Sequence, residues 1–199
     1  GKGVLSEGPA DFRLCTGIKA SPSDSLRVLG STLSPSLKRI IFQTNHESNN
    51  LYAETIAKTL SKTLTGSACY DSTYVAMESV MKDLGVDVSY GIKMADGSGL
   101  SRKNHVSPDF FCRFLTAMMA SHHFEDYLYS LPSPGSNGTL SANMKNSPAE
   151  MKARIKVKSG SMEGVRCYSG YIIPTEGCKD ETIVFSIMVN NCTAPTWKV

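Results

Sequence analysis

Residues 157–171 read VKSGSMEGVRCYSGY and carry the clearest strand signal of the chain. Two runs containing β-branched or aromatic residues, 155–159 and 165–173, lie on either side of Gly160 and Gly164 and predict neighbouring strands. A third run, 182–189, predicts another strand, joined to the second by a turn at 175–179. The C-terminal end of the chain is therefore expected to form a β-sheet.

The chain before residue 150 carries helical signals instead. Ser34 and Pro35 predict an N-cap and a first-turn proline, and the apolar residues after them recur at helical spacing. Helices are also predicted at 50–64 and at 72–84, and Ser107-Pro108-Asp109 opens a fourth, with an apolar stripe of Phe111, Phe114, Leu115 and Met118. Ser, Pro, Gly and Asn in 130–138 and 144–150 predict loops. Helices first and strands last favour an α+β fold with an antiparallel sheet.

The composition excludes several classes of protein. With 199 residues, 41% of them apolar and 20% charged, the chain can bury a core. Its 21 Lys and Arg residues are scattered among 18 Asp and Glu, so we expect no nucleic-acid partner. The longest apolar stretches, such as 183–189, are far shorter than the roughly 20 residues that span a bilayer, so we expect no transmembrane helix. No signal-peptide pattern opens the chain, which leaves a removed signal, a cytosolic protein or a missing N-terminus open.

The cysteines and histidines do not predict a metal or a cofactor. The six cysteines contain no C-x-x-C pair, and we expect mostly buried thiols, with one or two disulfides open. His122 and His123 are adjacent, so on a helix they point about 100° apart and cannot share a metal. His46 and His105 stand alone. There is no nucleotide-binding glycine motif either.

Two short motifs could carry chemistry. Lys158-Ser159-Gly160 ends a predicted strand, where an ammonium and a hydroxyl can bind a carboxylate and the glycine admits a ligand. Ser48-Asn49-Asn50 begins a predicted helix. Each motif alone is weak, because a strand-end lysine is usually solvated and Ser and Asn are ordinary N-cap residues. Together, S-x-N followed by K-[ST]-G is the later part of the signature of serine β-lactamases and penicillin-binding proteins.

The surrounding residues make this resemblance specific. Four blocks occur in the order of the D-alanyl-D-alanine carboxypeptidase/endopeptidase family, the class C low-molecular-mass penicillin-binding proteins, and the resemblance to this family covers about residues 25–192. They are S-N-N-L-Y-A-E at 48–54, D-G-S-G-L-S-R at 96–102, L-P to G-T-L at 131–140, and the strand pair at 157–171. The resemblance implies a β-lactamase/transpeptidase-like fold. Asn49 and Ser159 replace the usual Asp and Thr, and neither change is expected to abolish function.

The family's nucleophile motif, S-x-x-K, is missing before Ser48. Ser79 and Lys82 have that spacing, but they follow S-x-N and lie off the apolar stripe of their helix, so we expect them to be solvated. The resemblance therefore implies a partial fold that lacks the N-terminal part with the S-x-x-K helix. In this interpretation residues 1–30 are the tail of an inserted domain and a linker, and 31–199 are the C-terminal part of the transpeptidase domain, cut before its last helix.

The resemblance also implies roles for the motif residues. Ser48 would relay a proton to the leaving amine, and Asn50 would hydrogen-bond the substrate amide. Lys158 and Ser159 would hold the terminal carboxylate, while Gly160 allows its approach. The Ser161 N–H would form half of the oxyanion hole. Asp96 could border the pocket, although a tight Asp-Gly turn explains it equally well.

The implied whole protein is a bacterial serine-type D-Ala-D-Ala carboxypeptidase/endopeptidase of the periplasm or cell envelope. Its ligands would be peptidoglycan stem peptides and β-lactams. This chain, without the nucleophile, should be inactive, and its uncovered sheet could associate with another copy as a homo-oligomer. Two alternatives stay open: a β-lactamase of the same fold, or a noncatalytic binding or scaffold protein that has lost the serine.

Overall fold

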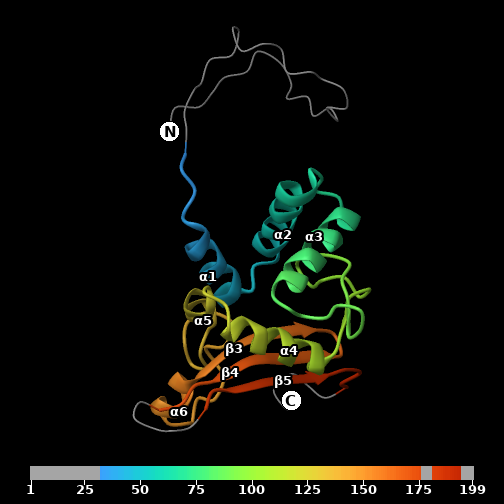
Figure 1. Ribbon diagram of the computed structural model, residues 1–199. Coiled ribbons are helices and arrows are strands. Elements are labelled where there is room, and N and C mark those ends of the chain that lie inside the picture. Colours follow the sequence, from blue (N-terminus) through green and yellow to red (C-terminus); the bar gives the residue numbers. More distant parts are fainter. Residues whose placement is uncertain (1–31, 176–180, 194–199) are drawn as a thin grey trace, which may run out of the picture. The chain divides into compact units, whose positions relative to one another are not determined.

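The computed structural model describes residues 32–175 and 181–193 (Figure 1). The chain divides into two units, Gly1–Ser34 and Pro35–Val199, and the described helices and strands belong to the second unit. The predicted inserted-domain tail at 1–30 therefore lies outside the described residues, as does most of the predicted turn at 175–179. Cys15 and Cys178 lie outside them too.

The four predicted helices are present, and two short helices were not predicted. The full set is α1 Leu37–Glu47, α2 Asn50–Thr65, α3 Tyr70–Asp83, α4 Pro108–Met119, α5 Phe124–Ser130 and α6 Ala149–Arg154. The Ser34 prediction was wrong by two residues, because the Ser36 hydroxyl accepts the Arg39 N–H and caps α1. Ser107 caps α4 as predicted. Helices α5 and α6 have 7 and 6 residues, under two turns, and leave no readable periodicity.

The three predicted strands form one antiparallel sheet. Strands β3 Ile155–Met162, β4 Val165–Ile172 and β5 Ile183–Val189 pair in the order β3-β4-β5. The β3–β4 hairpin closes between Met162 and Val165, where Gly164 has a positive φ of 73°. A further two-stranded ribbon, β1 Ile92–Lys93 with β2 His105–Val106, is too short to predict from the sequence. The α+β prediction is confirmed.

Helix α4 lies along one face of the sheet (Figure 1), and Tyr171 anchors the two layers. Tyr171 is fully buried and its hydroxyl donates to the Leu115 carbonyl of α4 at 2.8 Å. Its ring meets Phe124 and Tyr127 edge-on. Burying one aromatic ring with its hydroxyl satisfied therefore joins strand β4 to helices α4 and α5.

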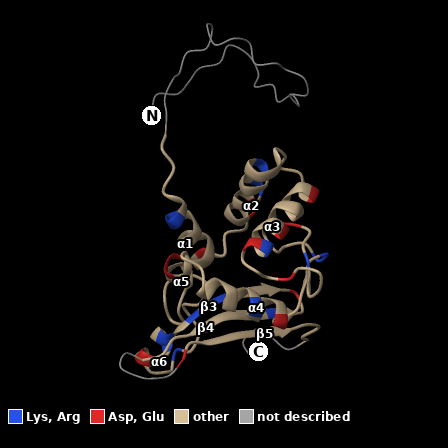
Figure 2. Ribbon diagram, viewed as in Figure 1, with Lys and Arg blue, Asp and Glu red and all other residues tan. Residues whose placement is uncertain are grey.

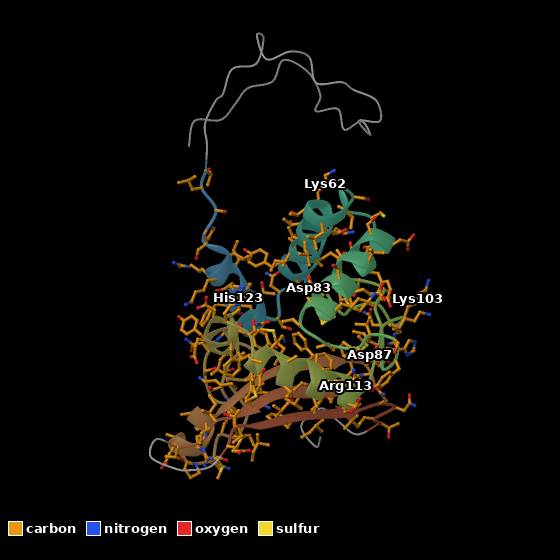
Figure 3. All side chains as sticks on the ribbon, in the orientation of Figure 1. Lys62, Asp83, Asp87, Lys103, Arg113 and His123 are labelled. Atoms are coloured by element: carbon orange, nitrogen blue, oxygen red, sulfur yellow. The ribbon has the colours of Figure 1, made fainter. Side chains whose placement is uncertain are left out.

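A second apolar cluster joins α3 to α4. Met81, Val86 and Phe110 are its buried members, so Phe110 and not the predicted Phe111 is the aromatic residue that α4 buries most deeply. Arg113 on α4 connects this helix to the segment after α3, because its guanidinium donates to the Asp87 backbone carbonyl at 2.8 Å (Figure 3).

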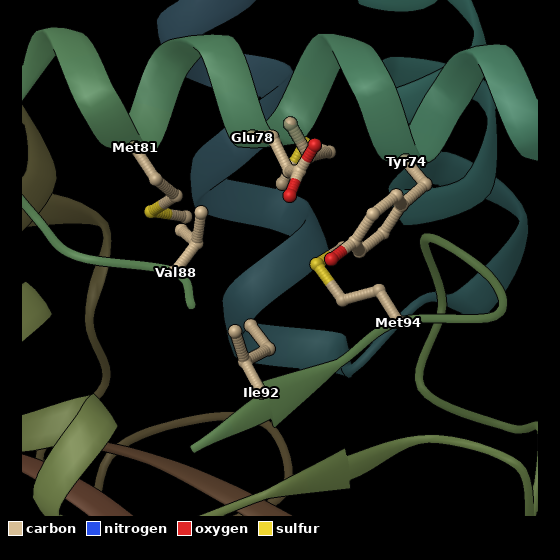
Figure 4. A pocket seen from close by; sticks show the side chains of 7 residues that line it. Tyr74, Glu78, Met81, Val88, Ile92 and Met94 are labelled. Carbon is tan, nitrogen blue, oxygen red and sulfur yellow. The ribbon is translucent and has the colours of Figure 1, made fainter. Parts of the chain in front are cut away.

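A cavity of about 10 Å³ remains between α3 and β1, lined by Tyr74, Met77, Glu78, Met81, Val88, Ile92 and Met94 (Figure 4). A cavity this small holds at most one water molecule. On the same helix, Ser79 and Lys82 are both exposed, as predicted for a solvated S-x-x-K sequence.

Charged residues do not segregate on this fold. Figure 2 shows basic and acidic residues interspersed over the described helices and strands. No helix among the described residues is both long and apolar enough to cross a bilayer.

Gly170 provides a test of how closely β3 and β4 approach. A Cβ at this position would lie 2.0 Å from the Lys156 carbonyl oxygen, whereas a Cβ on Gly160 would meet only Cys167 Cβ at 3.6 Å. We therefore expect Gly170→Ala to lower the free energy of unfolding by about 3 kcal/mol, because the neighbouring backbone must move. Urea denaturation followed by circular dichroism measures this change.

Gly160→Ala is the matched control. It sits in the same hairpin without a backbone clash, so its free energy of unfolding should stay within about 1 kcal/mol of the wild-type value. Equal losses from the two substitutions would contradict the close approach at Gly170.

Candidate active site

Ser48 lies in the turn between α1 and α2. Its backbone is left-handed, with φ 53° and ψ 46°, and it caps the C-terminus of α1. The N-cap of α2 is Asn49, whose side chain accepts the Tyr52 N–H at 3.0 Å. The capping role proposed for this motif thus falls on its middle residue, which leaves the Ser48 hydroxyl available for other contacts.

Lys158 reaches this turn from strand β3. Its ammonium donates to the Ser48 hydroxyl oxygen at 2.8 Å and to the Ser159 carbonyl at 2.5 Å. Ser48 and Lys158 are 110 residues apart in the sequence, so only the tertiary fold brings them together. The two motifs meet where the helical part of the fold touches the sheet.

The Lys158 ammonium has no negatively charged partner within residues 32–175 and 181–193. It is half-buried, and no carboxylate lies within 4.0 Å of it among the described residues. Burial lowers the pKa of Lys158 below its ordinary value, because the charged form loses hydration. A partly desolvated cation that meets only a hydroxyl and a carbonyl is suited to receiving an anion.

Thr139 stands beside the K-S-G motif, and sequence reasoning gave it no role. Its hydroxyl lies 3.4 Å from the Ser159 hydroxyl. The loop that carries Thr139 follows the outer edge of β3, where the Val157 N–H donates to the Pro132 carbonyl at 2.9 Å. The available signal was the G-T-L sequence of the block at 131–140, which was used only to support the resemblance.

The other predicted residues are not joined to this centre by contacts. Asn50 is exposed in the first turn of α2, and its side chain makes no hydrogen bond within the described part of the chain. Gly160 and Ser161 are exposed on β3. Because a Cβ on Gly160 would have ordinary van der Waals room, nothing in the described chain itself requires a glycine there.

Asp96 organises its own loop. Its carboxylate accepts the Gly99 N–H at 2.7 Å, the Ser101 N–H at 2.8 Å and the Asn104 amide at 2.9 Å. Burial alone would raise the pKa of Asp96, but these bonds, together with one from Ser98, outweigh it and lower the pKa. The hydrogen bonds therefore favour the tight-turn interpretation over a pocket border.

Glu54 docks this loop onto α2. Its carboxylate accepts the Gly97 N–H at 2.8 Å, and a Cβ on Gly97 would lie only 2.4 Å from Ala57 Cβ. The acidic end of the S-N-N-L-Y-A-E block and the D-G-S-G block are therefore parts of one contact.

The described cysteines are less buried than expected. Cys69 is exposed and Cys112 and Cys167 are half-buried, and these three carry free thiols. The buried-thiol prediction was wrong for them, because each lies at a helix start or on a partly open surface. No group of three His, Cys, Asp or Glu residues in 32–175 or 181–193 could hold a metal ion.

The chain matches a family model over residues 15–198, that of the D-Ala-D-Ala carboxypeptidase 3 (S13) family. The chain belongs to this family. A D-alanyl-D-alanine carboxypeptidase of Actinomadura sp. (strain R39) is 32% identical over 90% of the chain and 33% of its own length. A penicillin-sensitive carboxypeptidase A of Dictyostelium discoideum is 33% identical over 81% of the chain and 31% of its own length. The S13 chain thus spans about a third of the length of these curated relatives.

The fold agrees with a solved member of the penicillin-binding proteins. Penicillin binding protein 4 of Haemophilus influenzae, solved with a β-lactam, matches with a TM-score of 0.68 at 24% identity. The match covers 81% of the S13 chain and 36% of the Haemophilus chain. It confirms the predicted fold as a partial one.

The missing counter-ion of Lys158 predicts a pH-dependent stability. Because the pKa of Lys158 is lowered on folding, the unfolded chain binds this proton more tightly, and stability rises with pH up to the unfolded pKa. We expect wild type to gain stability relative to Lys158→Met as the pH rises toward the unfolded value of 10.5, measured by urea denaturation at a series of pH values.

Lys103→Met, at an exposed lysine outside the site, is the control. A difference between wild type and Lys158→Met that does not change with pH would contradict the description of Lys158 as a partly desolvated cation.

Proposed function

We propose that this S13 chain supplies the Ser48 and Lys158 part of the active site of a serine-type D-Ala-D-Ala carboxypeptidase/endopeptidase. The 2.8 Å hydrogen bond from Lys158 to Ser48 carries the proposal, because it assembles two separate motifs into one centre. Membership of the S13 family supports the reaction class. The nucleophilic serine and its lysine would come from a part of a longer protein that this sequence does not contain.

The proposed reaction is acyl transfer to that serine. Its hydroxyl gives its proton to the lysine of the S-x-x-K motif while its oxygen adds to the carbonyl carbon of the penultimate D-alanine, and the peptide C–N bond then breaks. Ser48 relays that proton from the lysine to the leaving amine, which departs as free D-alanine. Water subsequently adds to the ester carbonyl and regenerates the serine. The Lys158 ammonium favours the arrangement in which Ser48 accepts from Lys158 and donates its own proton toward the substrate.

Lys158 and Ser159 bind the terminal carboxylate in this proposal. An ammonium without a carboxylate partner in the described part of the chain, next to the Ser159 hydroxyl, matches one carboxylate group. Asn50 would contact the substrate amide, and the exposed Ser161 N–H would provide one oxyanion donor. Gly160 has no side chain, so a substrate can lie close to the backbone of β3 at this position.

The proposed substrates are peptidoglycan stem peptides, with β-lactams as their covalent mimics. The Haemophilus structure was solved with a β-lactam, and the Dictyostelium relative is named penicillin-sensitive. With such substrates, we propose that the whole protein works in the bacterial periplasm or cell envelope. The β-lactamase alternative is disfavoured because the Actinomadura and Dictyostelium relatives are named carboxypeptidases.

The missing nucleophile gives a direct test. The 199-residue chain should form no covalent adduct with a labelled penicillin, as measured by intact-mass spectrometry, because no serine in it has the required lysine and position. The longer protein that contains the S-x-x-K motif should form one adduct per chain and is the positive control.

A stoichiometric adduct on the short chain would contradict the fragment interpretation. An adduct on Ser79 would overturn the conclusion that the exposed Ser79–Lys82 sequence is not catalytic. A longer protein that folds and is not acylated would favour the noncatalytic scaffold alternative.

The carboxylate role of Lys158 is tested in the longer protein. Lys158→Ala removes the charge and should lower kcat/KM for a D-Ala-D-Ala peptide by about 100-fold or more. Ser159→Thr keeps a hydroxyl and should change kcat/KM by less than about 10-fold. Steady-state kinetics measures both, and comparable losses would contradict the assignment of Lys158 as the carboxylate anchor.

A further inference from the structure

His46 lies two residues before Ser48 and contacts neither motif of the proposed reaction directly. Its ring stacks on Phe42, one turn earlier in α1, with centroids 3.9 Å apart and an interplanar angle of 22°. The ring donates to the Asn137 backbone carbonyl. Its Nε2 atom is buried and has no hydrogen-bond partner among the described residues. The donor is therefore Nδ1, and the arrangement suits the neutral ring.

His46 holds the 137–139 loop at two points. Besides the ring contact with Asn137, its backbone carbonyl accepts the Thr139 N–H at 3.0 Å. Gly138, between them, has a φ of 93°, and a Cβ there would lie 2.2 Å from the His46 carbonyl oxygen. The loop is thus pressed against the C-terminal end of α1 as closely as a glycine permits.

This clamp determines where the Thr139 side chain lies. Thr139 is attached to His46 through its backbone and stands 3.4 Å from the Ser159 hydroxyl. His46 also precedes the Ser48 turn on the same helix. One residue therefore fixes the 137–139 loop in relation to both the S-x-N turn and the K-S-G strand.

We propose that the neutral His46 ring is a positioning residue for the carboxylate-binding end of the site, and that its protonation releases the 137–139 loop and weakens acylation in acid. This inference rests on the proposed function. A proton on Nε2 would create a buried N–H without an acceptor. The ring would have to turn to find one, and this turn would break the Asn137 contact, although that contact by itself favours the protonated ring.

The charges around the ring fit this role. Burial lowers the pKa of His46, opposed by the Asn137 carbonyl and by Glu47 on the same helix, while Lys156 of β3 lowers it further. Lys158 of β3 adds a second cation next to the Ser48 turn, and the ring of Tyr129 of α5 packs against the Phe42 ring. Since the pKa lies below 6.5, the neutral contact is complete above pH 6.5 and is lost as pH falls through the folded pKa.

Two substitutions separate the roles of the ring. His46→Asn can keep a donor near the Nδ1 position but cannot titrate, whereas His46→Phe keeps the stack on Phe42 and removes the donor. His105→Asn, at an exposed histidine on β2, is the control. The test uses the longer protein with its serine, and the readout is the rate constant of acylation by a fluorescent penicillin across the acid range.

We expect the wild-type and His105→Asn rates to fall together below pH 6.5, and the His46→Asn profile to lose this acid limb. His46→Phe should be slower by about 10-fold to 100-fold at neutral pH, because the loop is displaced. Superimposable wild-type and His46→Asn profiles would overturn the inference, as would a wild-type rate for His46→Phe.

Hydrogen exchange supplies a readout that needs no catalysis. After correction for intrinsic exchange, the protection of the Thr139 amide should decrease as the pH is lowered in wild type. In His46→Asn it should stay constant over the same pH range. If wild type is not acylated, the proposed function fails, and exchange alone then decides on His46. An equal decrease in Thr139 protection in wild type and His46→Asn overturns the inference. If His46→Phe does not fold, the comparison of wild type with His46→Asn is decisive.

Discussion

The hydrogen bond between the Lys158 ammonium and the Ser48 hydroxyl connects the helical part of this S13 chain to its sheet at the proposed site. It requires a left-handed turn that presents Ser48 and a strand face that presents Lys158 toward the helices. Neither partner provides a negative charge, so the contact does not neutralise the cation. The fold therefore retains a partly buried positive charge, which is costly for stability and useful for holding an anion.

Close backbone approaches keep the surrounding elements in place. Gly170 lets β3 and β4 come together, Gly138 lets the Thr139 loop press on α1, and Gly97 lets the D-G-S-G loop pack on α2. In each case a Cβ would collide with a neighbouring atom at under 3 Å. The glycines of the family blocks thus explain more of the architecture than of the chemistry. Gly160, in the K-S-G motif, differs from these three, because a Cβ there would have ordinary van der Waals room.

Tyr171 sets the orientation of the layers that carry these contacts. Its buried hydroxyl and ring fix β4 against α4 and α5, and β4 in turn pairs with β3 along its whole length. Lys158 is opposite Ser169 in that register. A shift by one residue would move Lys158 to the other face of the sheet, away from Ser48.

Much of the fold could be predicted because local patterns encode it. Helical spacing and caps located α2, α3 and α4, and the apolar runs of 155–173 and 182–189 located the sheet. The sequence by itself also determined the family, since four blocks occur in order. It misplaced the α1 cap and missed α5, α6 and the β1–β2 ribbon, which are too short to show a period.

The residues that share the site are brought together by contacts between distant segments. Ser48 meets Lys158 across 110 residues, while Asn50 stays exposed and Asp96 turns into its own loop. His46, isolated in the sequence, is placed against the Asn137–Thr139 loop by a helix end and a positive-φ glycine. Such contacts depend on strand register, turn handedness and side-chain direction in segments that are far apart in the sequence. A local pattern of residues specifies its own segment and not how that segment meets a distant one.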